Sequence, residues 1–448
     1  MPPITIKRGL DVPIDGRAAT STISDRLDVG QVALLPQQAR GIKTKLLVEE
    51  GQTVQVGQPL FHDRRDEAVL FTAPSAGKVR AIHRGARRLP LSVVIDVEGS
   101  GQIDLDAPKP GSASPEQLKA ALQTSGLWAN LRRRPYDTIA RTDDSPVGIV
   151  VTAMDTRPLA PRPLDALAGR EDAFRAGLAV LVALQSGAVF LCVAPGENWG
   201  ALTAEGVRTE TFAGPHPAGN AGTHIHHLCP VGGGRVAWHI GYQAVADIGQ
   251  FFTSGKLSTT RVVAITGPMA REPRLIRTRQ GAALAALSAG EGAQDEVRVV
   301  DGSALDGRHL ELAGPQGYLG RYGNQLTLLD DAVRRQLLGW MMPVAGRYSL
   351  TNLLLDKFFR KRFRMDTDSN GSLRAIVPIG VYERVMPLDI LATQLIKALA
   401  SHDMEGAEKL GALELAEEDL ALCEYVDPCK LPVTEMLRDM LTRIEKEG

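Results

Sequence analysis

The chain has 448 residues, with 51 lysine and arginine residues against 52 aspartate and glutamate residues. This balance leaves no basic surplus of the kind that drives nucleic-acid binding, so we expect no nucleic-acid partner. Four cysteines are too few for a disulfide scaffold, and 44% apolar residues are ordinary for a globular protein of about two to four domains. The N-terminus lacks the apolar core of a secretory signal, and polar residues interrupt the apolar run 178–194, so we expect a soluble chain.

The first hundred residues alternate apolar residues with glycine turns. Residues 46–61 and 69–82 form two short β units on either side of a polar tip that contains Arg64 and Arg65. This pattern resembles the barrel-sandwich fold of biotinyl and lipoyl carrier domains, which we expect over residues 1–103. Carrier domains present a lysine at the tip, whereas an arginine guanidinium cannot form the amide link to a swinging cofactor. The resemblance therefore implies a carrier fold without the carried group.

Alternating helices and strands predict a Rossmann-like α/β domain over residues 114–256. Ser114 and the proline that follows it are typical of a helix start. A buried strand is expected over residues 147–152, followed by a helix over Glu171–Leu184 and a second buried strand over Ala188–Val193. This order is typical of a partly parallel sheet covered by helices.

The rest of the chain predicts two further units. Residues 259–330 resemble a β-grasp (SLBB-like) module, with strands over 261–267, 274–278 and 297–300 and a short helix over 282–288. Residues 331–448 read as a mixed segment followed by a helical C-terminal region. In that region one helical face is expected to carry Leu388, Leu391, Leu395 and Leu399. The predicted fold class is thus α+β, with several domains.

Histidines and a cysteine gather in the glycine-rich segment 214–230. His224, His226 and Cys229 are ligand types that suit zinc, but the segment lacks a repeated C-x-x-C or H-x-x-x-H framework, so we expect no metal site. We interpret the segment as a Gly/Pro loop that leads into a strand, with His224 and His226 on one face. Its glycines match no phosphate-binding motif.

Other chemical motifs are weaker. The run 357–364 interleaves basic and aromatic residues and follows Trp340 and Tyr348; it could contact RNA, a membrane partner or anionic lipid, or simply form a solvated helix. Cys423 and Cys429 cannot hold an iron–sulfur cluster, which needs four thiolates. No nucleophile–histidine–acid motif and no carboxylate pair is present, so no catalytic residue is predicted.

Five motifs, at residues 4–14, 214–219, 222–226, 377–391 and 413–423, resemble those of one protein family. This family is the A subunit of the bacterial sodium-translocating NADH:quinone reductase, the Nqr complex, and the resemblance extends over essentially the whole chain. The family usually shows Cys-Pro-Gly-Lys where this chain has Asp-Pro-Cys-Lys at 427–430, so any redox role of that family cysteine is not carried over.

The resemblance implies a peripheral subunit on the cytoplasmic side of the bacterial inner membrane. The complex that it implies oxidises NADH, reduces ubiquinone and transports Na⁺. In this family the flavins and iron–sulfur centres reside on partner subunits, so no cofactor is expected on this chain. The chief partner implied is the large membrane-embedded B subunit of the same complex.

The sequence thus predicts a non-catalytic, cofactor-free scaffold at the quinone-reduction end of the complex. Candidate quinone-site residues, chosen for their chemistry and their place in the motifs, are His216, His224, His226 and Tyr382. Two alternatives remain: a redox subunit that binds a flavin or NADH in the α/β domain, and a zinc-binding adaptor that uses the histidine loop.

Overall fold

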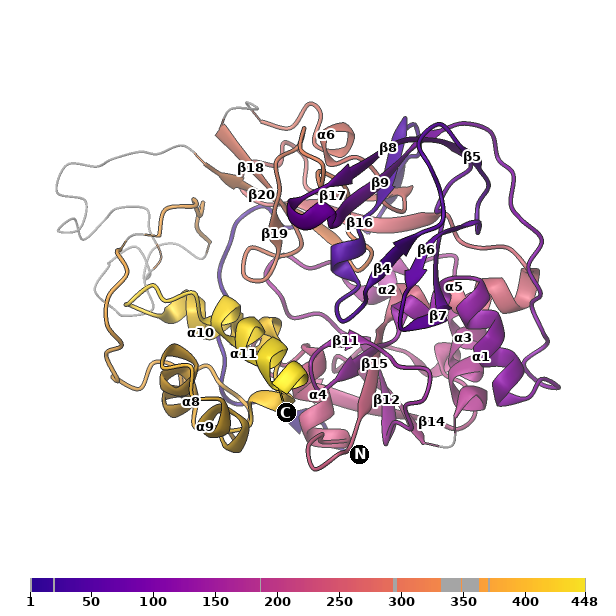
Figure 1. Ribbon diagram of the computed structural model, residues 1–448. Coiled ribbons are helices and arrows are strands. Elements are labelled where there is room, and N and C mark those ends of the chain that lie inside the picture. The colour runs from indigo at the N-terminus through magenta and orange to yellow at the C-terminus, as the bar shows by residue number, and fades with distance from the viewer. Residues whose placement is uncertain are drawn as a thin grey trace.

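Three bodies of β-structure and a C-terminal group of helices make up the computed structural model (Figure 1). It describes residues 2–18, 21–185, 187–292, 296–331, 348, 362–369 and 371–447. Most of the predicted aromatic and basic segment, including Trp340 and residues 357–361, lies outside these ranges. None of the described helices has the length and apolar character needed to cross a membrane.

The N-terminal domain is the predicted barrel-sandwich, built from a four-stranded and a three-stranded sheet. The aromatic rings of Phe61 and Phe71 stack in its core with centroids 4.6 Å apart. Arg64 and Arg65 lie in the turn between the last two strands of the smaller sheet. The strands are β3 (Gln31–Leu34), β9 (Pro90–Val97), β8 (Gly77–Arg84) and β5 (Thr53–Val54), and then β4 (Thr44–Leu46), β6 (Pro59–Asp63) and β7 (Asp66–Thr72).

The α/β domain contains a seven-stranded sheet in the order β1-β14-β13-β12-β15-β10-β11, whose central strands are parallel. Side chains of β12 alternate between two cores, because successive residues of a strand face opposite sides of the sheet. Ile149 and Val151 join one core, and Val150 joins the other. The strands are β1 (Ile4–Thr5), β14 (Val207–Ala213), β13 (Ala188–Val193), β12 (Gly148–Ala153), β15 (Ala237–Gly241), β10 (Arg132–Arg134) and β11 (Thr138–Ile139).

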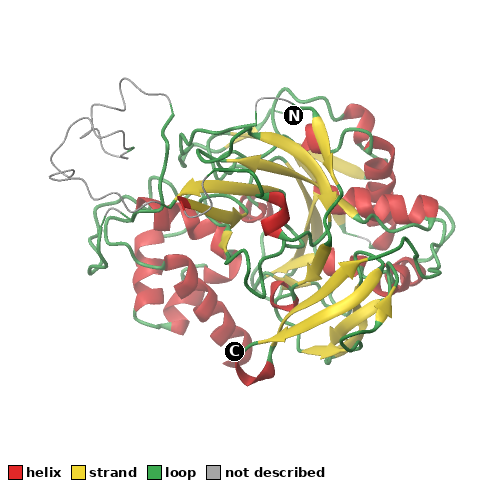
Figure 2. Cartoon of the chain, turned by 90° about the horizontal axis from the view of Figure 1, so that it is seen from above, coloured by secondary structure: helices red, strands yellow, loops and turns green. Residues whose placement is uncertain are grey.

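Helices cover both faces of this sheet (Figure 2). Helices α3 (Glu171–Leu184) and α5 (Tyr242–Ser254) share the core of Ile149, whereas α4 (Ala221–Leu228) packs beside Val150. Helix α1 (Pro115–Thr124) begins at the predicted site, where Ser114 forms a capping box with Gln117. A short helix, α2 (Pro163–Ala166), precedes α3.

The third unit is a six-stranded mixed sheet in the order β19-β18-β20-β16-β17-β2. The predicted sequence of two strands, short helix and strand is present as β16, β17, α6 and β18. The strand β20, in the middle of the sheet, was not predicted. The elements are β2 (Ile23–Arg26), β16 (Thr260–Thr266), β17 (Arg274–Arg279), α6 (Leu284–Leu287), β18 (Val297–Asp301), β19 (Arg308–His309) and β20 (Gln325–Asp330).

Two N-terminal strands lie outside the barrel, although the sequence analysis grouped residues 1–103 in one unit. Strand β1 pairs in parallel with β14 of the α/β sheet, and β2 pairs with β17 of the third sheet. The first 26 residues therefore connect the α/β domain with the third unit through backbone hydrogen bonds.

The C-terminal region is helical, with its own apolar core. One prediction needs correction: the helix begins only at Ala392, and Leu391 precedes it with 62% of its surface exposed. Leu388, Leu395 and Leu399 are buried, as expected of a core face. The helices are α8 (Ala392–Ala400), α9 (Met404–Lys409), α10 (Glu417–Val426) and α11 (Val433–Glu447).

Candidate functional site

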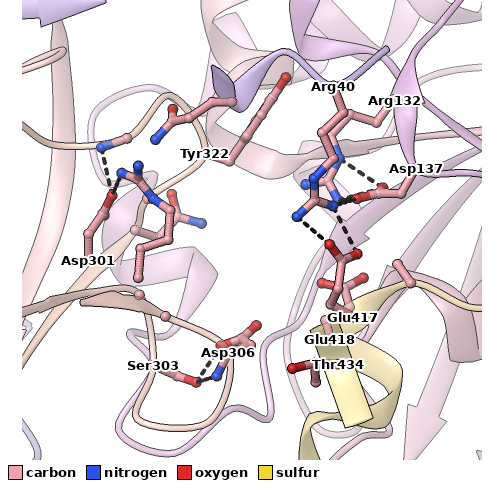
Figure 3. Close-up of a pocket in the computed structure, with 18 of the residues that line it drawn as sticks. Arg40, Arg132, Asp137, Asp301, Ser303, Asp306, Tyr322, Glu417, Glu418 and Thr434 are labelled. Carbon is pink, nitrogen blue, oxygen red and sulfur yellow. Dashed lines mark hydrogen bonds and ion pairs between the residues drawn. The ribbon is translucent and has the colours of Figure 1, made fainter. Parts of the chain in front are cut away.

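A cavity of about 490 Å³ lies where the four parts of the chain meet (Figure 3). Each part contributes polar side chains that face the open centre. The barrel supplies Arg40, the α/β domain Arg132 and Asp137, the third unit Asp301, Asp306 and Arg308, and the C-terminal helices Glu417, Glu418 and Thr434.

One wall of the cavity is organised around the carboxylate of Asp137, which is 2% exposed. It accepts hydrogen bonds from Arg132 at 2.6 Å, from Arg40 at 2.7 Å and from His239 at 3.1 Å. Burial alone would raise the pKa of Asp137, but Arg132, the His239 hydrogen bond and the other arginines hold it well below its usual value. Arg40 also pairs with Glu417 at 2.7 Å, which ties the barrel to α10.

Behind this wall, the fully buried Arg134 holds the start of α10. Its guanidinium donates to Asp419 at 2.9 Å, to Glu418 at 3.0 Å and to the backbone carbonyl of Glu414 at 3.2 Å. Burial and then the neighbouring Asp419 raise the pKa of Glu418 to about 7, although Arg134 opposes the shift. The carboxyl group of Glu418, in this part of the cavity wall, therefore exchanges its proton close to pH 7.

The opposite wall is also formed by ion pairs. Arg308 binds Asp301, which also accepts a hydrogen bond from the backbone of Gly320 at 2.9 Å. Arg157 pairs with Asp155 at 2.5 Å and with Asp306 at 3.4 Å. The arginines that line the cavity are thus paired with carboxylates, and the walls are charged rather than apolar. A quinone ring needs a mostly apolar slot with a few polar anchors, which this cavity does not provide.

The predicted residue His216 is 1% exposed. Its Nδ1 lies 3.2 Å from the hydroxyl of Thr156, and its backbone N–H donates to Asp11 at 2.9 Å. His216 thus fixes the loop before α4 against the N-terminal segment. Burial lowers its pKa.

His224 and His226 lie on a helix, which corrects the expected strand. Asn220 precedes the first turn of α4, and the glycines before it form the approach loop. Two residues along a helix turn by about 200°, so the two rings point to opposite sides. His224 is fully buried against Phe212, with ring centroids 4.4 Å apart, whereas His226 faces Glu414, with Nδ1 to Oε2 at 2.7 Å.

This geometry also separates the proposed zinc ligands. Cys229 follows the C-terminus of α4 and is buried beside Cys192 in the core under the helix. Among the described residues, no group of three or more His, Cys, Asp or Glu side chains is arranged to hold a metal ion. His224, His226 and Cys229 therefore do not converge on one site in this structure.

Tyr382 lies apart from the histidines, in the C-terminal core. Its hydroxyl donates to Asp427 at 2.9 Å, and this carboxylate also accepts the backbone N–H groups of Cys429 and Leu431. The tyrosine therefore supports the turn between α10 and α11. None of the four predicted residues lines the 490 Å³ cavity.

The ionic walls of the cavity were missed by the sequence analysis. Two charge runs were visible, Arg132–Arg134 and residues 417–419, but nothing local indicates that they pair across about 280 residues of chain. The sequence signals of this pairing are an arginine triplet followed by proline and an acidic triplet at a helix start.

Comparison with known proteins identifies related domains. Three family descriptions match: "NqrA N-terminal barrel-sandwich hybrid domain" at residues 4–98, "NqrA second alpha/beta domain" at 113–257 and "NQRA C-terminal domain" at 262–311.

Full-length relatives carry the name of the A subunit of the Na(+)-translocating NADH-quinone reductase. The protein of Yersinia pseudotuberculosis serotype O:1b is 46% identical, and that of Pasteurella multocida is 45% identical; each match covers 99% of this chain and 100% of the relative. Among solved structures, an NAD⁺-reducing [NiFe]-hydrogenase in its air-oxidized state is 14% identical with a TM-score of 0.38, over 75% of this chain and 64% of that one.

Proposed function

The chain belongs to the NqrA family, the A subunit of the Na⁺-translocating NADH-quinone reductase, and we propose that it acts there as a non-catalytic scaffold at the quinone-reduction end of the complex. The observation that carries this proposal is the 46% identity over the full length of a named relative. Its proposed position is peripheral, on the cytoplasmic side of the bacterial inner membrane, with the large membrane-embedded B subunit of the complex as its chief partner.

The cofactor-free part of the proposal rests on the chemistry of the residues present. The barrel tip carries Arg64 and Arg65 where a carrier lysine would stand. Burial raises the pKa of the Cys229 and Cys423 thiols to about 12, which disfavours the thiolates that iron–sulfur clusters require.

The alternative of a flavin- or NADH-binding protein is less well supported. The cavity at the strand ends of the α/β domain has a volume of only about 120 Å³, and the 490 Å³ cavity beside it has charged walls, whereas sites for molecules of this size are mostly apolar. An absorption spectrum of the purified chain separates the two hypotheses. We expect no flavin band, and a stoichiometric flavin released on denaturation would favour the alternative.

The four quinone-site candidates differ in exposure, and the proposal assigns them different roles. His216, His224 and Tyr382 are at most 1% exposed and are proposed as positioning residues. The side chain of His226 is 19% exposed and is proposed as the direct contact. In the assembled complex, His226→Ala should raise the KM for quinone, whereas His227→Ala on the same helix should not. Equal KM values in both variants would exclude His226.

Exposed apolar side chains offer a surface for the membrane partner. Half of the large hydrophobic residues that are exposed in the described structure lie within residues 373–391: Leu373 (68%), Val377 (48%), Ile379 (62%) and Leu391 (62%). This segment runs along the outer edge of the molecule near α8, far from the barrel (Figure 1). Such a concentration of apolar surface is typical of an interaction site.

Assembly of the complex tests the proposal directly. Cells that lack this chain should lose Na⁺-dependent NADH:quinone reductase activity. Re-expressed Ile379→Asp should co-purify less with the membrane subunits than the wild type, while Leu89→Asp, at an exposed position on the barrel, should co-purify normally. A fully active complex assembled without the chain would overturn the proposal.

A further inference from the structure

A second cavity, of about 120 Å³, lies at the carboxyl ends of β12 and β15. The chain runs from β12 outward to β13 and β14 on one side, and then returns to place β15 on the other side. The cavity therefore sits where the strand order reverses. In open α/β sheets this crevice is the usual ligand position, because the loops on its two sides diverge.

Two helices begin at this cavity. Gly219, Asn220 and Ala221 line it at the start of α4, and Gly241 to Ala244 line it at the start of α5. Neither helix has a side-chain hydrogen bond at its N-terminus. The first N–H groups of a helix have no partner within the helix, and they favour a negative charge nearby. Uncapped donors from two helices thus converge on one small space.

A buried arginine without a counter-ion lines the same cavity. Arg261 is 6% exposed, and its guanidinium donates to the backbone carbonyl of Arg321. No carboxylate of the described residues forms an ion pair with it; the nearby Asp247 is paired with Arg170 at 2.7 Å. A buried charge destabilises the fold unless it is paired, so a bound anion would stabilise this guanidinium.

Two hydroxyl groups in the cavity also lack partners. The hydroxyl of Tyr242, a residue 2% exposed, and that of Thr152 have no hydrogen-bond partner among the described residues, since the neighbouring amide of Gln243 is bound to Val262 and Asn324. Burial raises the pKa of Tyr242, so its phenol remains a donor. Unpaired buried hydroxyls are costly, and a bound acceptor would satisfy them.

Each acidic side chain that lines the cavity has an arginine partner, which it shares with a second carboxylate. Asp155 pairs with Arg157 at 2.5 Å, and Glu418 pairs with Arg134 at 3.0 Å. The remaining positive lining residue, Arg132, is bound to Asp137 at 2.6 Å. Among the described arginines that line the cavity, Arg261 is therefore the one that forms no ion pair with a carboxylate.

We propose that this cavity binds a small oxyanion, of the size and charge of phosphate, between Arg261, the Tyr242 hydroxyl and the N-termini of α4 and α5. The oxyanion can be a free ion or the terminal group of a polar phosphate ester. The rest of a phosphate ester would fit in the adjoining 490 Å³ cavity. The two cavities share five lining residues, Arg132, Arg157, Tyr322, Asn324 and Glu418.

Calorimetric titration of the full chain with inorganic phosphate tests the site. Arg261→Gln should weaken binding by about tenfold or more, since it removes a charged donor, and Tyr242→Phe by a smaller factor. Arg271→Gln, at an exposed position, removes the same charge elsewhere and should leave the affinity unchanged. Absence of binding to the folded wild type, or equal weakening by Arg271→Gln, would overturn the proposal.

Two further measurements keep the result interpretable. Arg261→Lys retains the charge without the planar fork, so a folded variant should keep part of the affinity that Arg261→Gln loses. If neither variant folds, Tyr242→Phe decides, and an unchanged affinity would overturn the proposal. Titration with ribose 5-phosphate separates the two sources: tighter binding than phosphate indicates an ester whose body occupies the larger cavity, and equal binding indicates the free ion.

Discussion

At the scale of single residues, the structure depends on charges removed from water. Arg134 is completely buried, and its guanidinium satisfies carboxylates at the start of α10, about 280 residues further along the chain. Such a pair adds little compared with a well-packed apolar pair, but removal of one partner leaves an uncompensated charge in the interior.

Arg134→Leu should therefore lower the free energy of unfolding by about 3–5 kcal/mol. Arg175→Leu, which removes an exposed pair with Asp172 on the surface of α3, should lower it by less than about 1 kcal/mol. Urea unfolding followed by circular dichroism measures both. Similar losses in the two variants would contradict the role given to the buried guanidinium.

His224 makes stability depend on pH. Burial is the main cause that lowers its pKa to about 3 from an ordinary value of 6.5. Between pH 6.5 and pH 3 the imidazole of His224 is protonated in the unfolded chain but stays neutral in the folded chain. Its effect on the free energy of unfolding is therefore absent above pH 6.5, and the protein loses stability as the pH falls from 6.5 toward 3.

Because of His224, the free energy of unfolding of the wild type should fall by about 2 kcal/mol between pH 7.5 and pH 5. His224→Leu should remove this loss, so its stability relative to the wild type should rise on acidification. His83→Leu, at an exposed position, is the matched control. Urea midpoints at the two pH values measure the effect, and parallel pH profiles for His224→Leu and the wild type would refute it.

At the scale of elements, helices α3 and α5 approach closely enough to exclude a single methyl group. A Cβ added to Gly249 would lie 1.7 Å from the carbonyl oxygen of Ala173, and one added to Gly177 would lie 2.0 Å from that of Val245. Both obstacles are backbone atoms, so a side chain cannot be accommodated without moving a helix.

Gly249→Ala should destabilise the protein by about 3 kcal/mol, because the overpacking outweighs the gain of about 1 kcal/mol in helix propensity. Gly30→Ala introduces the same methyl group where no atom lies within 4 Å, and should change stability little. Thermal unfolding compares the two. A stable Gly249→Ala variant would show that the helices can separate at no cost.

Elements with local signals were predictable from the sequence. Helix α3 and strand β13 have the predicted bounds, because apolar residues recur with a helical period in α3 and form a continuous apolar run in β13. Helix α4 was not predicted. Its eight residues, Ala221–Leu228, are too few to show a period, and three histidines suggested ligands rather than a helix.

At the scale of the whole molecule, the barrel and the α/β domain share one apolar core. Leu60 and Phe71 of the barrel belong to the same cluster as Trp128 and Trp238 of the α/β domain. The C-terminal helices form a second apolar cluster, which Val12, Ile14 and Leu159 join from the rest of the chain, and the ionic walls of the 490 Å³ cavity add polar contacts to it. Such long-range charge pairing has no local signature, which is why the sequence did not reveal the cavity.

Leu60→Ala, a truncation in the barrel, should therefore lower the unfolding midpoint reported by tryptophan fluorescence from the α/β domain. Truncation of a fully buried leucine such as Leu60 to alanine lowers the free energy of unfolding by about 2–5 kcal/mol. Leu89→Ala, at an exposed barrel position, should leave the midpoint in place. An unchanged midpoint for Leu60→Ala would mean that the two domains unfold independently.

The placement of the N-terminal strands has a consequence for biosynthesis. Strand β1 needs residues near Phe212, β2 needs residues near Leu275, and Ile14 forms a bridge to Phe363. During translation the barrel can close early, but β1 has no partner until Phe212 has left the ribosome, β2 none until Leu275, and Ile14 none until Phe363. The first residues to be synthesised thus wait for partners that are synthesised long after the barrel, and a premature stop before those partners would leave them as unpaired strand edges for quality control to recognise.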